Sequence, residues 1–376
     1  MVYLRVVLFY FFLFPFIMLP IREPQTTSLQ YSYPAGNPYP PPVTPGIPDV
    51  TTRSYLPIVL KNNAQQYNPF PTNSFYLKNI DNLYNMGCEF GTILSMDSGI
   101  QHVFTFLDFG VPNRDGNGRL GTVTYNQKPV PIEDIKDAVI DFASGFYGCT
   151  AYDQVMISVG TNSSGGSYTD LIAFNHGAAW AQLVIDINTT IIATGMSSRV
   201  TAAAGNNIEP NYNSFDIPNH WLQGYDSVNN PKKTLVYIIG SADGCPTNYP
   251  PSTPGQYSAA ICYEHPVYHW TWTQADVLYV NWGYYLSYPI PEIYDSVMAD
   301  QWYRLSLYAN FNNGFPIRFP GTLTQQGACF QDGTCPPGTN IGPITGFNLL
   351  YSRLQGDIYT VPDSSMIWAT DIRYGN

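Results

Sequence analysis

Residues 199–213 read RVTAAAGNNIEPNYN, and their character changes from small and apolar to polar within a few positions. The apolar part is nearly continuous, as expected for a parallel strand that is covered on both faces. Small side chains let such a strand lie close to its neighbours, and Pro210 ends regular pairing. The stretch therefore predicts a buried strand whose carboxyl end displays Glu209 among amide side chains.

Similar short apolar runs alternate with longer amphipathic stretches along the chain. One predicted helix begins at Pro131, a favoured first helical residue, and repeats apolar side chains every three or four positions. The other predicted helices cover 168–193 and 291–310. The predicted strands are 91–97, 102–110, 154–162, 199–207, 234–244, 276–283, 318–325 and 366–373. This alternation indicates an α/β fold with parallel strands.

Acidic or amide residues stand at the carboxyl ends of these runs. They are Asp97, Asp108, Asn162, Glu209 and Asp243. In a closed barrel such positions converge on one mouth, whereas in an open sheet they spread along an edge. We therefore predict a (β/α)8-type, TIM-like barrel, regular or irregular, rather than an open doubly wound sheet.

The composition constrains the partners of this protein. Charged residues make up only 11% of the chain and aromatic residues 15%, with 30 tyrosines. A surface of neutral polar groups and tyrosines suits hydroxyl-rich partners such as polysaccharides. The net charge of −11 argues against nucleic acid, because binding to phosphates is dominated by basic residues.

The N-terminal residues 1–21 contain an uncharged apolar run after Arg5. The run is shorter than the ~20 residues of a spanning helix and contains two prolines, so it favours an export signal, with an uncleaved membrane anchor as the alternative. Residues 22–66 are rich in Pro, Ser, Thr and Tyr, which is typical of a linker. We expect the folded domain at 67–376 to be extracellular, secreted or tethered to the cell surface, and to touch a membrane only through an uncleaved leader.

The six cysteines are an even number, which fits an oxidising compartment. We favour the pairs Cys329 with Cys335 and Cys245 with Cys262, because each closes a short loop. Cys88 is then left to pair with Cys149.

Asp108 and Glu209 are the predicted catalytic pair. Asp108 lies in the apolar run FTFLDFG, where a carboxylate is costly unless it is paired or functional. Glycoside hydrolysis needs one carboxyl group to protonate the leaving oxygen and a second to act as nucleophile or to activate water. We assign Glu209 as the general acid, because limited solvation raises its pKa, and Asp108 as the stabilising or nucleophilic carboxylate. The alternatives are a solvated or helix-capping Glu209 and a structural Asp108.

Further candidates are weaker. Asp97, Asp243, Asn207 and Glu292 are possible supporting residues, and a role in turns is the alternative for the two aspartates. Four aromatic residues are candidates for stacking on sugar rings, with a place in the core as the alternative: Trp282, Tyr212, Trp221 and Tyr225.

No cofactor or metal site is predicted. GNGRLG, residues 116–121, matches the dinucleotide pattern G-x-G-x-x-G, but extended residues rather than a helix follow it. His265 and His269 stand four apart, but Pro266 breaks the helix that a zinc protease motif requires.

Several segments between residues 88 and 355 carry a resemblance to a known family. They are, in order, TFLDFG, AAAGNNIEPNYNSF, HWLQGYD, YVNWG and PEIYDSVMADQWYRLSLYA. Together they resemble exported bacterial barrels similar to the lysozyme-type glycoside hydrolases of family 25. The resemblance implies a TIM-like barrel with an acidic site at the strand ends, and a carbohydrate substrate such as the cell-wall glycan peptidoglycan.

The chain departs from that family in lacking an Asp-x-Glu on a central strand. Its NNIEP segment also resembles the Asn-Glu-Pro strand end of many retaining glycosidases, with Ile208 inserted between Asn207 and Glu209. Glu292 is the candidate for a second glutamate at the end of a late strand. The sequence therefore predicts a secreted glycoside hydrolase, with a non-catalytic carbohydrate-binding or structural envelope protein as the alternative.

Overall fold

A computed structural model describes residues 69–164, 169–228, 234–248, 259–284, 286–333, 335, 340–362 and 365–375. The predicted leader at 1–21 and the predicted linker at 22–66 lie outside these residues. None of the helices in the described part of the chain is long and apolar enough to cross a membrane.

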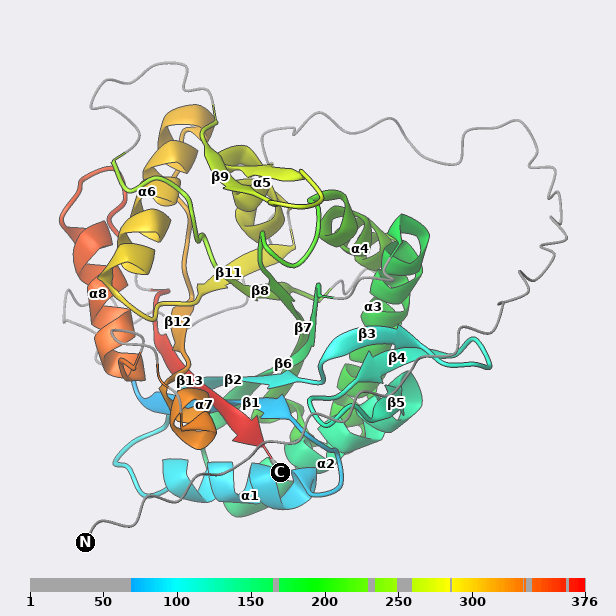
Figure 1. Ribbon diagram of the computed structural model, residues 1–376. Helices are drawn as coiled ribbons and strands as arrows, with labels where there is room; N and C mark the ends of the chain where they lie inside the picture. The colour runs from blue at the N-terminus through cyan, green and yellow to red at the C-terminus, as the bar shows by residue number, and fades with distance from the viewer. Residues whose placement is uncertain are drawn as a thin grey trace, which may run out of the picture. The chain divides into compact units, whose positions relative to one another are not determined.

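One sheet of eight parallel strands organises the described residues, and its strands follow one another in chain order. Figure 1 shows these strands arranged as a ring, with helices outside it. The strands are β1 (Pro71–Leu77), β2 (His102–Asp108), β6 (Gln154–Asn162), β7 (Val200–Ile208), β8 (Val236–Gly240), β11 (Ser287–Pro291), β12 (Gly321–Thr324) and β13 (Trp368–Gly375). The predicted (β/α)8 barrel is confirmed.

The ring closes between β11 and β12. Glu292 forms a parallel bridge with Leu323, and the N–H of Ile293 donates to the Leu323 carbonyl oxygen over 2.9 Å. Continuing each strand register around the ring leads from Ile208 back to Val200 on the same strand, eight residues earlier. The path runs through Ile208, Gly240, Pro291, Thr322, Ala369, Pro71, Val103, Val155 and Val200. Eight strands with a shift of eight residues are the geometry of a TIM barrel.

Helices and short strands connect the barrel strands. The helices are α1 (Leu83–Leu94), α2 (Ile132–Cys149), α3 (Asp170–Ala193), η2 (Met196–Ser198), α4 (Asp216–Ser227), α5 (Gln274–Leu278), the π-helix η3 (Tyr279–Gly283), α6 (Ser296–Asn313), α7 (Gln326–Asp332) and α8 (Pro343–Gln355). The remaining strands are β3 (Val111–Arg114), β4 (Leu120–Val123), β5 (Pro129–Pro131), β9 (Ile261–Glu264) and β10 (Thr271–Thr273). The three predicted helices correspond to α2, α3 and α6, although α6 begins five residues later than predicted, after β11.

Two predicted strands are wrong. Residues 91–97 are the end of α1 and a turn, and residues 276–283 belong to α5 and η3. A short apolar run is compatible with a buried strand or with a buried helix, and its period does not separate them. The missing places in the ring are taken by β1 and β11.

β11 escaped prediction because its sequence, SYPIP, contains two prolines, which are unusual in a central strand. The N–H of Glu292 faces β8 and that of Ile293 faces β12. Because backbone groups of successive residues in a strand face opposite neighbours, the backbone nitrogens of Pro289 and Pro291 face β12. Regular pairing between β11 and β12 is absent from the described registers except for the single bridge at Glu292. The prolines therefore occupy positions where a backbone donor is not used.

The interior of the barrel is filled in layers. A shift of one residue per strand means that each layer takes its side chains from alternate strands. These registers place Phe106, Gly205, Ile290 and Thr370 in one layer, and Asp108, Asn207, Glu292 and Ile372 in the layer above it. A Cβ atom on Gly205 would lie 2.6 Å from the Phe106 ring. The small residues of AAAGNN therefore make room inside the barrel, in addition to letting strands approach.

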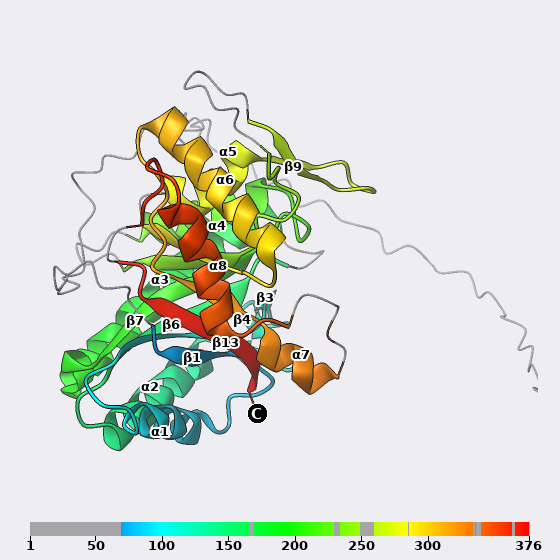
Figure 2. The ribbon, with the colours of Figure 1, turned by 90° about the vertical axis from the view of Figure 1, so that its left-hand side faces the viewer.

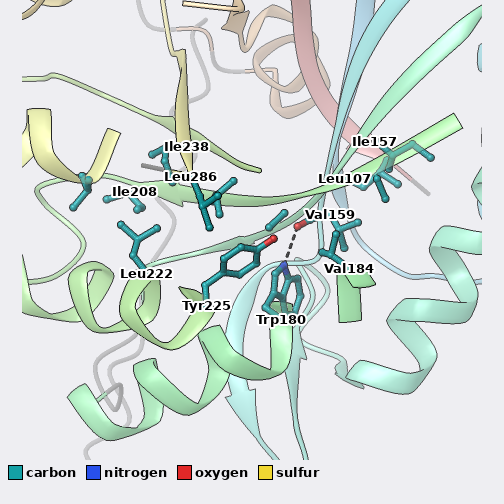
Figure 3. Close-up of a cluster of buried hydrophobic side chains, with 14 of the residues drawn as sticks. Leu107, Ile157, Val159, Trp180, Val184, Ile208, Leu222, Tyr225, Ile238 and Leu286 are labelled. Atoms are coloured by element: carbon teal, nitrogen blue, oxygen red, sulfur yellow. Dashed lines mark hydrogen bonds between the residues drawn. The ribbon is translucent and has the colours of Figure 1, made fainter. Parts of the chain in front are cut away.

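A second core lies between the strands and the helices. Figure 3 shows part of it, where Trp180 of α3 donates from Nε1 to the Val159 carbonyl oxygen over 2.9 Å. Disulfides join Cys88 to Cys149, Cys245 to Cys262 and Cys329 to Cys335, so all three predicted pairs are confirmed.

Candidate functional site

Three carboxyl groups lie at the carboxyl ends of the second, fourth and sixth strands of the ring. Asp108 is the last residue of β2, while Glu209 and Glu292 directly follow β7 and β11. In TIM barrels this end of the strands carries the functional groups. The described residues thus have an acidic mouth, defined here by Asp108, Glu209 and Glu292.

Asp108 is fully buried and holds its own turn. Its Oδ1 accepts from the N–H of Gly110 over 2.8 Å, and its Oδ2 accepts from the Tyr125 hydroxyl over 2.7 Å. Gly110 has φ of +92°, and a Cβ atom there would lie 2.2 Å from the Val123 carbonyl oxygen, so only glycine fits this turn. Burial raises the pKa of Asp108 to about 6, against the lowering effect of both hydrogen bonds.

Glu209 is only partly buried and lies in a β-turn that the sequence explains. The N–H of Tyr212 donates to the Glu209 carbonyl oxygen over 3.0 Å, with Pro210 at the second position, which proline favours in such turns. The turn brings the Tyr212 hydroxyl back to the Glu209 carboxylate as a hydrogen-bond donor. Burial raises the pKa of Glu209, and the negative charge of Asp243 raises it further.

Glu292 is almost as buried as Asp108, with 1% of its surface exposed. Its Oε1 has no hydrogen-bond partner, whereas Tyr294 donates a hydrogen bond to the carboxyl group. Burial raises its pKa well above the ordinary value, and the charges of Glu209 and Asp108 raise it further. Both effects favour the protonated form of Glu292.

Four tyrosines surround these carboxyl groups. Tyr125 and Tyr212 donate to Asp108 and Glu209, Tyr294 donates to Glu292, and Tyr76 is close enough to feel the charge of all three. Burial is the largest cause that raises the pKa of each tyrosine, so all four remain protonated donors. Only Tyr212 was a sequence candidate.

The missed tyrosines had no signal in the sequence. Tyr76 lies on β1, one of the two strands that prediction overlooked, and Tyr125 lies in the turn between β4 and β5. Its N–H donates to the Leu77 carbonyl oxygen over 3.1 Å, which docks this turn against the end of β1.

The supporting candidates separate into two groups. Asn207 is buried in the layer of Asp108 and Glu292, and its Oδ1 has no hydrogen-bond partner. Asp243 follows β8, is exposed, and lies within electrostatic reach of Glu209. Asp97, by contrast, follows α1 and precedes β2, which is the opposite end of the barrel. Because it precedes β2 instead of ending a strand, the prediction of Asp97 at the mouth is wrong. Its Oδ1 accepts from the Ser98 N–H over 2.8 Å in a turn.

Three of the four predicted sugar-stacking residues are instead in the core. Trp221 and Tyr225 of α4 stack at 5.6 Å, and Trp221 Nε1 donates to His176 Nδ1 over 3.0 Å. Trp282 is 2% exposed within η3. Figure 3 shows Tyr225 packed among aliphatic side chains. These three rings have almost no accessible face, and only Tyr212 lies at the mouth.

The mouth combines carboxyl groups of different proton affinity. Burial raises the pKa of Asp108 to about 6, and burial with two neighbouring carboxylates raises that of Glu292 well above its ordinary value; acid and base roles require carboxyl groups whose pKa values differ in this way. No group of three or more His, Cys, Asp or Glu in the described residues is placed to hold a metal ion.

No protein-family model matches the chain, and no curated protein matches it in sequence. Among solved structures, it is similar to a GH18 chitinase from Pseudoalteromonas aurantia, with 11% identity, a TM-score of 0.40, and coverage of 81% of this chain and 94% of that chain. It is also similar to a sugar phosphate isomerase/epimerase from Parabacteroides distasonis ATCC 8503, with 12% identity, a TM-score of 0.38, and coverage of 84% and 89%. Similarities this distant carry no argument about function.

Strand order and register therefore define the class of this protein, a TIM barrel with an acidic, tyrosine-lined mouth. Neither similar structure is a family 25 enzyme, and that part of the resemblance stays a prediction.

Proposed function

We propose that this protein is a secreted glycoside hydrolase that acts on cell-wall or other extracellular polysaccharide. The observation that supports the proposal is the convergence of Asp108, Glu209 and Glu292 at one barrel mouth with raised pKa values. Acid and base catalysis by carboxyl groups requires such tuning, because the groups must hold and release protons near the working pH.

Glu209 is the proposed general acid. It is the most exposed of the three carboxyl groups, and its raised pKa favours a proton available for the glycosidic oxygen. Asp108 is the proposed nucleophile or base, because it is ionised above about pH 6 and two donors hold its oxygens in place. Glu292, whose raised pKa favours its protonated form, would position the substrate by donating a hydrogen bond.

The configuration of the hydrolysis product depends on the distance between the carboxyl groups of Asp108 and Glu209. Carboxyl groups ~5 Å apart form a covalent intermediate and retain configuration, whereas a gap of ~6.5–9.5 Å admits a water molecule and inverts it. Proton NMR of the first-formed product distinguishes the two.

The three disulfides are consistent with an extracellular protein. Together with the apolar N-terminal run, they support the proposal of export and of a polysaccharide substrate outside the cell.

Substitution of the pair tests the proposal. Glu209→Gln and Asp108→Asn should each lower the rate of polysaccharide hydrolysis by about 10²–10⁴-fold, the range for loss of general acid–base catalysis. Reducing-sugar release from peptidoglycan, chitin and neutral polysaccharides measures the rate. Asp97→Asn is the matched control, because it removes a carboxylate at the opposite end of the barrel and should leave hydrolysis unchanged.

The second candidate function is a non-catalytic polysaccharide-binding or envelope protein. It is favoured by the burial of Asp108 and Glu292, which are 0% and 1% exposed. Each accepts a hydrogen bond from a tyrosine hydroxyl, as a carboxyl group with a purely structural role also does. Binding without any hydrolysis would decide for this alternative, whereas equal hydrolysis by Glu209→Gln and the wild type would contradict the assignment of Glu209 as general acid.

A further inference from the structure

A hairpin outside the barrel displays aromatic side chains to solvent. It comprises β9, β10 and the tip between them, residues 265–270, and is called here the aromatic hairpin. Figure 2 shows it projecting from the rest of the domain. At its tip, Val267 is 68% exposed and Tyr268 is 71% exposed. Exposed apolar groups gathered at one tip indicate a contact surface.

The aromatic hairpin is fastened to the mouth. Trp270 donates from Nε1 to the carbonyl oxygen of Pro210, the residue after Glu209, over 3.3 Å. Trp272 donates to the Asn213 carbonyl oxygen over 2.8 Å, and the disulfide from Cys262 reaches Cys245, in the loop that follows β8. The aromatic hairpin is therefore attached to the loops after β7 and β8, which border the mouth.

The tip is held in one conformation. His265 Nδ1 accepts from the N–H groups of Val267 and Tyr268 over 3.1 and 3.0 Å. His269 has φ of +57°, which costs about 1 kcal/mol or more for a residue other than glycine. Such strain persists where the surrounding contacts over-determine it, and it is often found at binding sites.

The aromatic rings form a stack. The rings of Tyr268 and Trp270 are nearly parallel, with centroids 5.2 Å apart and an angle of 7° between their planes. The ring centroid of His265 lies 4.1 Å from that of Trp270. Because the hydroxyl-bearing ring of Tyr268 is mostly exposed, the stack presents apolar ring surface together with polar edges. Pyranose rings have this same combination of flat C–H faces and hydroxyl edges.

We propose that the aromatic hairpin binds an uncharged stretch of a polysaccharide chain that extends out of the mouth past Glu209. The position of this surface along the substrate rests on the proposed function, while the binding itself does not require hydrolysis.

The size and charge of the surface favour a glycan over other partners. A buried aromatic residue contributes roughly 150–250 Å², whereas a stable protein interface takes about 800 Å² from each partner. Two stacked rings therefore suit a few sugar units. The net charge of −11 and the exposed Glu264 on β9 disfavour an acidic polymer.

Binding of the full chain to insoluble cellulose, chitin and peptidoglycan tests this proposal, with Glu209→Gln as the background so that hydrolysis does not consume the probe. Tyr268→Ala should weaken binding to at least one probe roughly tenfold, the size of a stacking contribution of about 1.4 kcal/mol. Tyr268→Phe should keep the affinity. Tyr152→Ala is the matched control, because Tyr152 is 73% exposed and lies between α2 and β6, at the other end of the barrel.

Hydrolysis of a short soluble glycoside separates this proposal from the proposed function. Tyr268→Ala should leave that activity and the melting temperature unchanged, because the side chain is exposed. Equal binding by Tyr268→Ala and its parent, or no binding to any probe, would overturn the proposal. A change in oligomeric mass caused by Tyr268→Ala would overturn it in favour of contact between copies. If Tyr268→Ala loses binding and the wild type shows no hydrolysis, the binding proposal is supported and the proposed function as an enzyme is contradicted.

Discussion

At the scale of residues, the mouth concentrates unfavourable electrostatics. Glu292 is almost entirely buried, one of its carboxyl oxygens has no hydrogen-bond partner, and two neighbouring carboxylates raise its pKa. A buried carboxyl group responds to such surroundings by keeping its proton. The protein therefore loses stability in order to hold these groups together, a pattern that is common at functional sites.

Glu292→Gln should reveal this loss through its pH dependence. Because the pKa of Glu292 is raised above 4.5 by folding, its contribution to stability is fully present below about pH 4.5 and is lost as pH rises toward the folded pKa. Glutamine has no proton to lose. The free energy of unfolding of the variant should therefore increase relative to that of the wild type as pH rises, by at most about 1.4 kcal/mol per pH unit.

Thermal unfolding from about pH 4 to about pH 9 measures the difference. Glu89→Gln, at an exposed position of α1, is the control for removal of a carboxyl group at the surface. A constant difference between Glu292→Gln and the wild type would contradict the raised pKa.

At the scale of elements, glycines set how closely neighbouring parts approach. On β6, a Cβ atom at Gly160 would lie 2.1 Å from the Phe106 ring, and on the helices a Cβ atom at Gly145 would lie 1.9 Å from the Tyr84 carbonyl oxygen. The first contact shapes the barrel interior directly below the mouth, and the second lets α1 and α2 pack closely. These glycines are required for space and not for a positive φ.

Gly160→Ala should destabilise the fold by about 1–3 kcal/mol, because the added methyl group overpacks the barrel interior. Adding Phe106→Leu should recover part of this loss, since a smaller side chain vacates the overlap, and the two changes should therefore be non-additive. Urea unfolding of the single and double variants measures the coupling.

Gly116→Ala provides the control, because a Cβ atom there meets nothing within 4 Å. If the effects of Gly160→Ala and Phe106→Leu on the free energy of unfolding are fully additive, contact with the Phe106 ring is not the cause of the loss in Gly160→Ala.

At the scale of the whole molecule, closure of the ring depends on contacts between distant segments. β1 pairs with β13 almost 300 residues later, with Pro71 opposite Ala369. Disulfides fasten the surrounding elements, and Cys88–Cys149 ties α1 to α2 across 61 residues of sequence. Cross-links that span long loops restrict the unfolded chain most.

Removing Cys88–Cys149 by a double serine substitution should therefore cost about 4 kcal/mol in the chain-entropy model, against about 2 kcal/mol for Cys329–Cys335, which spans 6 residues. Urea unfolding under oxidising conditions gives both values. A larger loss from the short cross-link would contradict this ranking.

Much of the fold was predictable because local patterns carry it. Continuous apolar runs identified β2, β6, β7, β8, β12 and β13, and a 3.6-residue period identified α2 and α3. The pattern failed for β1, whose interior positions include the polar Thr72 and Ser74, and for β11, whose prolines face the seam. In both strands tertiary contacts override the local preference.

For the candidate site, Asp108 and Glu209 were found because carboxylates stand out at the ends of apolar runs. Tyr76, Tyr125 and Tyr294 were missed because nothing distinguishes them among 30 tyrosines. Trp221 and Tyr225 were misplaced for the same reason, since composition does not tell a core ring from an exposed one.

The amino-acid sequence by itself determined the alternation of strands and helices and the carboxylates at the strand ends, because each depends on neighbouring residues. It favoured the disulfide pairs without fixing them, since six cysteines allow fifteen pairings. Only the tertiary structure decided that the ring closes with a shift of eight residues, that Glu292 joins Asp108 in one layer, and that tyrosine hydroxyls face these carboxyl groups. Parallel pairing and burial both arise between segments far apart in the chain, and proton affinity at the mouth follows from that burial.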